Sequence, residues 1–239
     1  MGDIISRLII KFKSCADLEY SCIGKYDVQG FLYSLLKGTD LSVYHNVRGF
    51  KFFNFSNIFP VADFKVGDVR SLIVSSPNDL FIQVLNDSLD GLDGFRLNKF
   101  YFTLVSVRFL RTRVGSCLIT STPIVLFEDN TVNRYYSFKS GPDFDFFFNR
   151  LLDNALKKFN AFTDDDFVLD GELFNSFSFK KEVAVKVSKK GNSFLIIGSL
   201  WNSLEFDLNQ GNKGFYQFLF DVGLGEKNSL GFGMLNNKR

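Results

Sequence analysis

The chain has 239 residues, of which 46% are hydrophobic and 23% are charged, a balance that excludes a disordered tail, a collagen and a coiled-coil rod. The net charge of +2 argues against binding to nucleic acids through overall basicity, so any site for phosphates must come from local clusters. Three cysteines and one histidine are too few for a disulfide framework and for a His-rich metal site.

The first half of the chain predicts strands and helices in the order β-α-β-β-α-β, which is the ferredoxin-like unit. Alternating residues indicate strands, and apolar residues at i, i+3, i+4 and i+7 indicate helices. The predicted elements are a strand over 4–13, a helix around 28–35, a short turn over 41–45, strands over 51–55 and 70–76, a helix opened by Pro77-Asn78-Asp79, and a strand over 99–110.

The second half predicts roughly the same order again. Its elements are strands over 116–119 and 124–127, a helix over 143–159, a strand around 183–187, a hairpin turn at 189–192, a return strand over 193–208, a short helix around 215–222 and a last strand over 231–235. We therefore expect an α+β fold of two tandem ferredoxin-like (RRM-like) domains, with residues 1–113 in the first and 114–239 in the second.

Phenylalanine is unusually abundant, at 31 residues, and predicts a core built largely from Phe rings. No apolar run approaches the ~18 residues of a transmembrane helix. Asp3 and Arg7 interrupt the N-terminal stretch, which therefore lacks the apolar core of a signal peptide. We expect a cytoplasmic protein with reduced thiols and no membrane partner.

Charge is unevenly placed along the chain. Residues 96–113 carry five basic side chains and no acid, and residues 180–190 carry five lysines against Glu182. Residues 143–172 instead carry eight acids against three basic side chains, which are Arg150, Lys157 and Lys158. The two basic segments fit either a solvated face or a groove for a phosphate backbone.

Four glycines fall within residues 223–233, Gly-Leu-Gly-Glu-Lys-Asn-Ser-Leu-Gly-Phe-Gly, after the last predicted helix. The segment lacks the Gly-Lys-[Ser/Thr] ending of a P-loop. It also follows a helix and precedes a strand, whereas nucleotide-binding loops run from strand to helix. A turn that needs glycine for its backbone angles is one reading, and close approach of backbone amides to a phosphate-rich ligand is the other.

A glycine-rich loop of this form, after the last helix of a second ferredoxin-like domain, resembles the repeat-associated (RAMP) RNA-binding superfamily of CRISPR systems. Within it the chain resembles, over its whole length, the family-six CRISPR-associated endoribonucleases that process repeat RNA. The matching stretches are 222–234 and His45-Asn-Val-Arg-Gly-Phe-Lys-Phe-Phe53, which follows a helix containing Gln29-Gly-Phe-Leu-Tyr33.

The resemblance implies metal-independent RNA cleavage without a cofactor, in which the ribose 2′-OH attacks the neighbouring phosphate and leaves 2′,3′-cyclic phosphate and 5′-OH ends. It implies His45 as general base or acid, Lys51 as the cation that stabilises the phosphorane, and Tyr33 as a second proton-transfer or positioning group. Tyr44, beside His45, is a rival for the tyrosine role.

The resemblance also implies CRISPR repeat RNA as the partner and a role in antiviral defence. Candidate RNA-binding residues are Gly223, Gly225, Lys227, Asn228, Ser229, Gly231, Gly233, Arg48, Arg111, Arg113, Lys189 and Lys190. Subunits of a CRISPR effector complex and a second copy of the chain, as a homodimer, are further candidate partners.

Three other functions remain open on the sequence. The chain could be a repeat-RNA binder without catalysis, a structural subunit of an effector complex, or an unrelated metabolite-binding protein of the same fold. The presence of both His45 and Lys51 favours the enzyme, because a binder or structural subunit does not need that pair.

Overall fold

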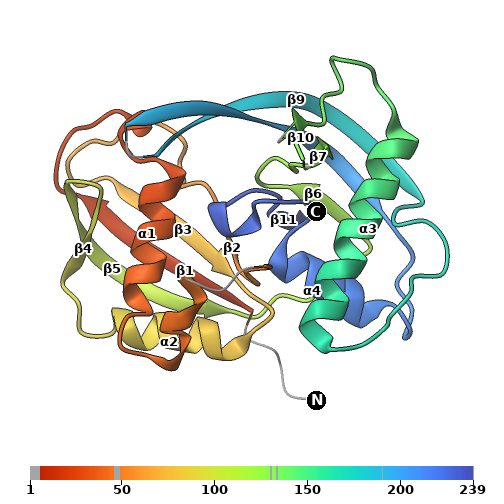
Figure 1. Cartoon of the computed structure of the whole chain (residues 1–239). Helices are drawn as coiled ribbons and strands as arrows, with labels where there is room; N and C mark the ends of the chain where they lie inside the picture. The colour runs from red at the N-terminus through yellow and green to blue at the C-terminus, as the bar shows by residue number, and fades with distance from the viewer. Residues whose placement is uncertain (1–5, 46–48, 130, 133, 190, 239) are drawn as a thin grey trace.

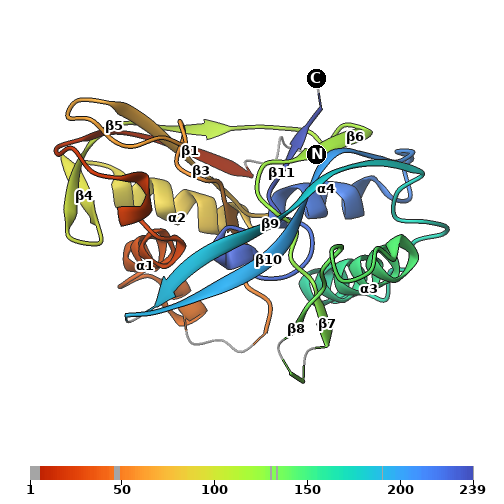
Figure 2. The same cartoon turned by 90° about the horizontal axis from the view of Figure 1, so that it is seen from above.

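The computed structural model describes residues 6–45, 49–129, 131–132, 134–189 and 191–238, apart from the side chains of Tyr44 and His45. The N-terminal half contains one five-stranded antiparallel sheet in the order β2-β3-β1-β5-β4, with two helices on one face (Figures 1 and 2). Its elements are β1 (Arg7–Ser14), α1 (Lys25–Leu35), β2 (Asn54–Phe55), β3 (Val69–Ser75), α2 (Asp79–Leu89), β4 (Gly94–Leu97) and β5 (Phe100–Leu110), with short 3-10 turns at Tyr20–Cys22 (η1) and Asp40–His45 (η2).

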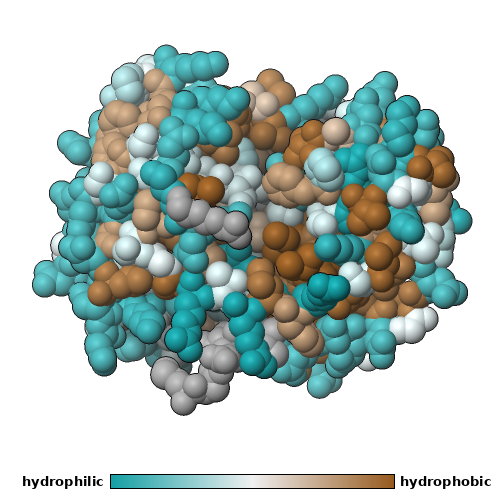
Figure 3. Space-filling model, turned by 180° about the vertical axis from the view of Figure 1, so that it is seen from behind, coloured by the Kyte–Doolittle hydropathy of each residue, from teal (hydrophilic) through white to brown (hydrophobic). Residues whose placement is uncertain are grey.

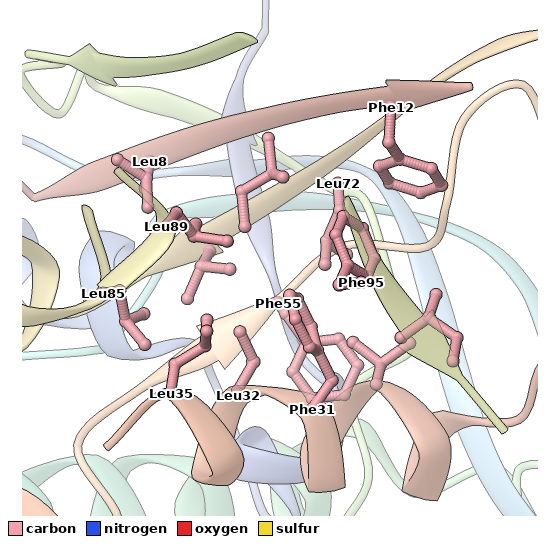
Figure 4. Packing of buried hydrophobic residues seen from close by; sticks show 14 of the residues in the cluster. Leu8, Phe12, Phe31, Leu32, Leu35, Phe55, Leu72, Leu85, Leu89 and Phe95 are labelled. Carbon is pink, nitrogen blue, oxygen red and sulfur yellow. The ribbon is translucent and has the colours of Figure 1, made fainter. Parts of the chain in front are cut away.

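The N-terminal core lies between this sheet and its helices. On β1, alternation buries Leu8, Ile10 and Phe12 completely, and α1 faces them with Phe31 and Leu32 (Figure 4). Phe rings fill much of the space, as their abundance in the sequence indicated. The opposite face of the sheet lies towards the back of the molecule, where apolar and hydrophilic residues are interspersed (Figure 3).

The C-terminal half repeats the arrangement with a four-stranded antiparallel sheet in the order β11-β6-β10-β9. Its elements are β6 (Cys117–Thr120), a small hairpin of β7 (Phe127–Asp129) and β8 (Arg134–Tyr135), α3 (Phe144–Thr163), β9 (Ser176–Lys189), β10 (Asn192–Glu205), α4 (Lys213–Val222), a 3-10 turn η3 (Asn228–Leu230) and β11 (Leu235–Asn237). Trp201, only 1% exposed, packs among Phe rings at the centre of this second core. The fold is thus a pair of tandem ferredoxin-like domains, as predicted.

Three predicted strands differ from those observed. The strand expected over 51–55 shrinks to two residues of β2, and the one expected over 124–127 makes isolated bridges before β7 leaves the main sheet. The last strand begins at Leu235 instead of 231, because Gly231 and Gly233 have positive φ angles that an extended ladder does not accept. The short strand β4 was missed, since four residues are too few for a periodic signal.

The connection between the two sheets runs from 111 to 116 and includes the predicted domain boundary at 113/114. It is fixed to the C-terminal half. The Gln217 side chain accepts from the backbone of Val114 and donates to the carbonyl of Thr112, while Asn237 bonds the backbone on both sides, at Arg113 and Gly115. The segment between the sheets is therefore held against α4 and β11.

The structure bears on two further expectations from the sequence, those about thiols and about membrane-spanning segments. Cys15, Cys22 and Cys117 are free thiols. Within the described ranges, no helix has both the length and the apolarity that crossing a membrane requires.

Arg7, the first residue of β1, joins the two halves. Its guanidinium is 2% exposed, lies 3.8 Å over the ring of Phe220, and donates to the carbonyls of Phe220 and Leu235 at 3.0 and 2.8 Å. It also donates to the side chain of Asn236 at 2.9 Å. One buried cation thus ties the first strand to α4 and β11.

The carboxyl of Asp221, beside Arg7, makes the stability of this contact between the halves depend on pH. Burial raises its pKa from 3.8 to about 6, while Gln217, Ser6 and Arg7 act in the opposite direction. The folded state therefore binds more protons between about pH 4 and 6, and its unfolding free energy falls as the pH rises through this window. We expect the unfolding free energy of Asp221→Asn, relative to that of wild type, to rise by up to about 3 kcal/mol from pH 4 to pH 7. Urea unfolding at several pH values measures this difference, and a constant difference would contradict it.

Candidate active site

The glycine-rich segment, residues 223–233, connects α4 to β11 and lies largely buried between the two halves of the molecule (Figure 1). Gly231 has a φ of +75°, and a Cβ there would run into the ring of Phe55 on β2. Gly233 has a φ of +72°, and a Cβ there would meet the carbonyl of Leu224. Glycine is required at both positions because other residues favour neither that angle nor such close packing.

Lys158 of α3 holds the segment from the C-terminal side. Its ammonium is buried and donates to the carbonyls of Gly223 and Gly225 and to the side chain of Asn228, at 2.7, 2.9 and 2.9 Å. Burial lowers the pKa of Lys158 to about 7, whereas the nearby carboxylate of Glu226 raises it. Three acceptors match the three donors of an ammonium group, so the contacts favour the charged form.

The N-terminal half holds the same segment from the other side. Side chains on α1 and β2 donate to its backbone carbonyls, each at 2.8 Å: Lys25 to Gly231, Gln29 to Ser229, and Asn54 to Phe232. The conformation of the segment is thus set by both halves together.

Lys51 precedes β2, where two neighbouring rings point into different halves. Phe53 is completely buried in the N-terminal core, while Phe52 packs against Phe162 and Phe218 of the C-terminal half. This anchoring places Lys51 at the junction of the halves. Partial burial there lowers the pKa of Lys51.

Tyr33 lies on α1 with its ring edge against Phe53, at a centroid distance of 5.7 Å. Burial raises the pKa of Tyr33, and the side chain of Ser229, close by in the glycine-rich segment, lowers it. The phenol therefore lies beside the segment and stays protonated near neutral pH.

A cavity of about 400 Å³ opens where these elements meet. Its walls come from the chain before β2, from α3 and from the glycine-rich segment, and are formed by Gly49, Phe50, Lys51, Arg150, Asp153, Asn154, Lys157, Lys158, Gly225, Glu226, Lys227, Asn228 and Ser229. Five of these residues are cations and two are carboxylates, so the cavity has an excess of positive charge. A phosphate-bearing ligand suits such a surface.

The structure thus brings Lys51, Lys227, Asn228 and Ser229 to one cavity, with Tyr33 beside Ser229. His45 ends η2, the short turn predicted over 41–45. Its side chain, the side chain of Tyr44 and all of Arg48 lie outside the described residues.

Two predicted RNA-binding residues, Lys227 and Lys189, also lie close to each other. The long β9–β10 hairpin reaches across to α1 (Figures 1 and 2), where Lys189 lies 5.0 Å over the ring of Tyr26. Burial lowers the pKa of Lys227, and the nearby charge of Lys189 lowers it as well. The ammonium of Lys227 lies 5.0 Å from the ring of Phe127. Lys190 lies outside the described residues.

The other predicted RNA-binding residues have different surroundings. Arg111 and Arg113 are exposed on the connection between the sheets and do not line the cavity. The predicted glycines are buried, and the side chain of Asn228 bonds Leu224 and Phe232 as well as Lys158. These contacts give the glycines and Asn228 a structural task, and their contact with RNA stays a prediction.

Sequence reasoning missed the contribution of α3. Arg150, Asn154, Lys157 and Lys158 follow the spacing i, i+4, i+7 and i+8, which places them on one helix face. That spacing was a usable signal, but the surrounding acids made the segment look like a solvated acidic face.

The two candidate tyrosines can be separated by substitution. We expect Tyr33→Phe to lower the rate of RNA cleavage by about 10²-fold, the usual size of one proton-transfer or positioning contribution, because it removes the hydroxyl that lies beside Ser229. Tyr44→Phe serves as the comparison, with a change below about threefold. Single-turnover rates on one labelled RNA measure both, and the reverse order would assign the role to Tyr44.

Comparison with known proteins supplies a family. The sequence model described as "CRISPR associated protein Cas6, C-terminal" matches residues 110–237. The "CRISPR-associated endoribonuclease Cas6 2" of Methanocaldococcus jannaschii is 41% identical over 238 residues, covering 96% of this chain and 98% of the relative. The corresponding protein of Haloferax mediterranei is 23% identical, covering 96% and 93%.

Solved structures agree on the fold. A structure described as "CRISPR associated protein Cas6" superposes with a TM-score of 0.71 at 21% identity, covering 98% of this chain and 99% of the other. A Cas6-related protein from Pyrococcus furiosus gives a TM-score of 0.68 at 18% identity, covering 98% of both. With two ferredoxin-like domains, a glycine-rich segment fixed between them and a full-length relative at 41% identity, the chain belongs to the Cas6 family.

Proposed function

We propose that this chain is a metal-independent endoribonuclease that cleaves CRISPR repeat RNA to produce guide RNA. The observation that carries the proposal is the convergence of Lys51 and Tyr33, from separate elements, on the same glycine-rich segment at Ser229 and its cavity. The M. jannaschii relative, similar over nearly its whole length, is named as a CRISPR-associated endoribonuclease and supports the same activity.

The reaction needs three contributions from the protein. A base takes the proton of the ribose 2′-OH, which attacks the adjacent phosphorus; an acid returns a proton to the departing 5′-oxygen; and a cation stabilises the charge of the phosphorane. The products are a 2′,3′-cyclic phosphate and a 5′-OH. His45 has the side-chain chemistry for proton transfer near neutral pH, and Lys51 supplies the cation.

Tyr33 fits a positioning or proton-donating role better than that of a base. Its raised pKa keeps the phenol protonated near neutral pH, where it can donate a hydrogen bond to a phosphate oxygen or protonate the leaving group. The general base is then left to His45.

The test is cleavage of a labelled CRISPR-repeat RNA in EDTA by wild type and by His45→Ala. We expect wild type to cut and leave a cyclic phosphate, and the variant to lose about 10²–10⁴-fold in rate. An RNA with a 2′-deoxy group at the cleaved nucleotide should bind but stay intact. Cutting of the deoxy RNA would exclude the mechanism, and binding without cutting of the unmodified RNA would favour a non-catalytic repeat-RNA binder.

A further inference from the structure

The α3 wall of the cavity carries polar groups that the chemistry above does not use. Arg150, Asn154 and Lys157 occur at i, i+4 and i+7 of the helix, and all three line the cavity that also contains Lys51. They come from the C-terminal half, whereas Lys51 comes from the N-terminal half. A ligand that reaches Lys51 in this cavity therefore lies alongside α3.

Asn154 has a hydrogen-bonding capacity that the protein leaves unused. Its side-chain oxygen is buried and finds no hydrogen-bond partner within the described part of the chain. An acceptor left in that state is less favourable than one that is paired. The oxygen is shielded from solvent, so a donor on a bound ligand would pair with it after the side chain turns towards the cavity that Asn154 lines.

The two cations beside Asn154 are only loosely engaged. Arg150 approaches the carboxylate of Asp153 at 3.6 Å and the carbonyl of Phe127 at 3.5 Å, both at the limit of bonding distance. Lys157 pairs with the same carboxylate at 2.8 Å, but its side chain is 65% exposed. Arg150 also acts on the carboxyl of Glu226, whose pKa burial raises and Arg150 lowers. Five cations against these two carboxylates leave the cavity with net positive charge for a phosphate.

We propose that Arg150, Asn154 and Lys157 form a binding subsite for one nucleotide next to the scissile phosphate, with the two cations on a phosphate and the Asn154 oxygen accepting a hydrogen bond from the base. The subsite rests on the proposed function, since it assumes that RNA enters the cavity at Lys51. It adds recognition of a base to a cavity whose charged side chains are suited to phosphates.

Asn154→Leu tests the base contact by a direct comparison of RNAs. The probe is the 2′-deoxy repeat RNA, which binds without being cut, together with copies that carry one abasic nucleotide at successive positions. We expect Asn154→Leu to weaken binding of the intact RNA by about 5- to 10-fold. The loss should vanish for the abasic RNA at one position next to the scissile phosphate. The thermal midpoint should stay unchanged or rise, because the substitution removes an unpaired buried oxygen.

The matched control is Asn202→Leu, on the exposed face of β10 and away from the cavity, which should bind every RNA like wild type. Equal binding by Asn154→Leu and wild type would overturn the proposal. So would a loss of the same size on every abasic RNA, since that pattern points to a distant effect. Cleavage of the unmodified RNA by wild type is scored separately, so failure of the subsite is distinguishable from failure of the proposed function.

Lys157→Gln tests the phosphate contact through salt dependence. We expect the slope of log affinity against log salt to flatten by about 0.7, the value for one phosphate contact on a single strand. Lys65→Gln is a close control, because Lys65 also pairs with an aspartate, at 3.1 Å, and its side chain is 71% exposed. An unchanged slope for Lys157→Gln, or an equal change for both variants, would contradict the phosphate contact.

Discussion

Lys51→Ala is expected to lower the single-turnover rate of RNA cleavage by about 10²–10³-fold, the usual effect of removing one group that stabilises charge in a transition state. Affinity for the 2′-deoxy RNA should fall by less than about tenfold, because one phosphate contact of several is lost. The physical reason is position: Phe52 and Phe53 fix Lys51 at the junction of the halves, on the cavity wall.

Two further variants make the prediction about Lys51 specific. Lys99→Ala, at an exposed site on the turn between β4 and β5, should cleave like wild type. Lys51→Arg should keep part of the rate. It should also move the loss of activity at alkaline pH to higher values, because burial lowers the pKa of Lys51 and arginine stays charged. A rate for Lys51→Ala within threefold of wild type would contradict the assignment.

Lys158→Met is expected to cost about 3 kcal/mol or more of unfolding free energy. The substitution keeps the length of the side chain but leaves two carbonyls, of Gly223 and Gly225, and the side chain of Asn228 without their shared donor. Cleavage should fall as well, because Lys227 and Ser229 depend on the conformation of the same segment. Urea unfolding gives the stability, and single-turnover assays of the folded variant give the rate.

The neighbouring residue provides the control for Lys158. Lys157→Met changes the same residue type one position away, but its side chain is exposed, so its unfolding free energy should stay within about 0.5 kcal/mol of wild type. If Lys158→Met matched that value, the three hydrogen bonds would contribute nothing measurable, and the glycine-rich segment would have to be held by the N-terminal half.

The sequence predicted the order of the main elements because their periodicity is strong. Leu8, Ile10 and Phe12 alternate along β1, and Val28, Phe31, Leu32 and Leu35 mark the buried face of α1. Residues 231–234 alternate as well and imitate a strand, but the positive φ angles at Gly231 and Gly233 arise from packing against Phe55 and Leu224, which lie elsewhere in the chain.

The candidate site could be predicted only in part. Their positions in the sequence do not predict that Tyr33 and Lys51 come together in the fold, so the roles of both residues rested on resemblance. Lys158 gives no local signal, since a lone lysine in an acidic helix is normally solvated, and only the folded chain reveals the three acceptors around it.

Four side chains of the N-terminal half donate hydrogen bonds to the C-terminal half, and almost all of their acceptors are main-chain carbonyls. The four donors are Arg7, Lys25, Gln29 and Asn54. A carbonyl is present whatever residue occupies the position, so these hydrogen bonds do not depend on the identity of the residues that accept them. The apolar contacts between the halves do depend on residue type, since Phe52 packs against Phe162 and Phe218, and Phe55 leaves room only for glycine at 231. Chimeras that join the N-terminal half of one relative to the C-terminal half of another should therefore assemble wherever the four donors and these apolar contacts are kept, which allows RNA-binding surfaces to be exchanged between family members as whole units.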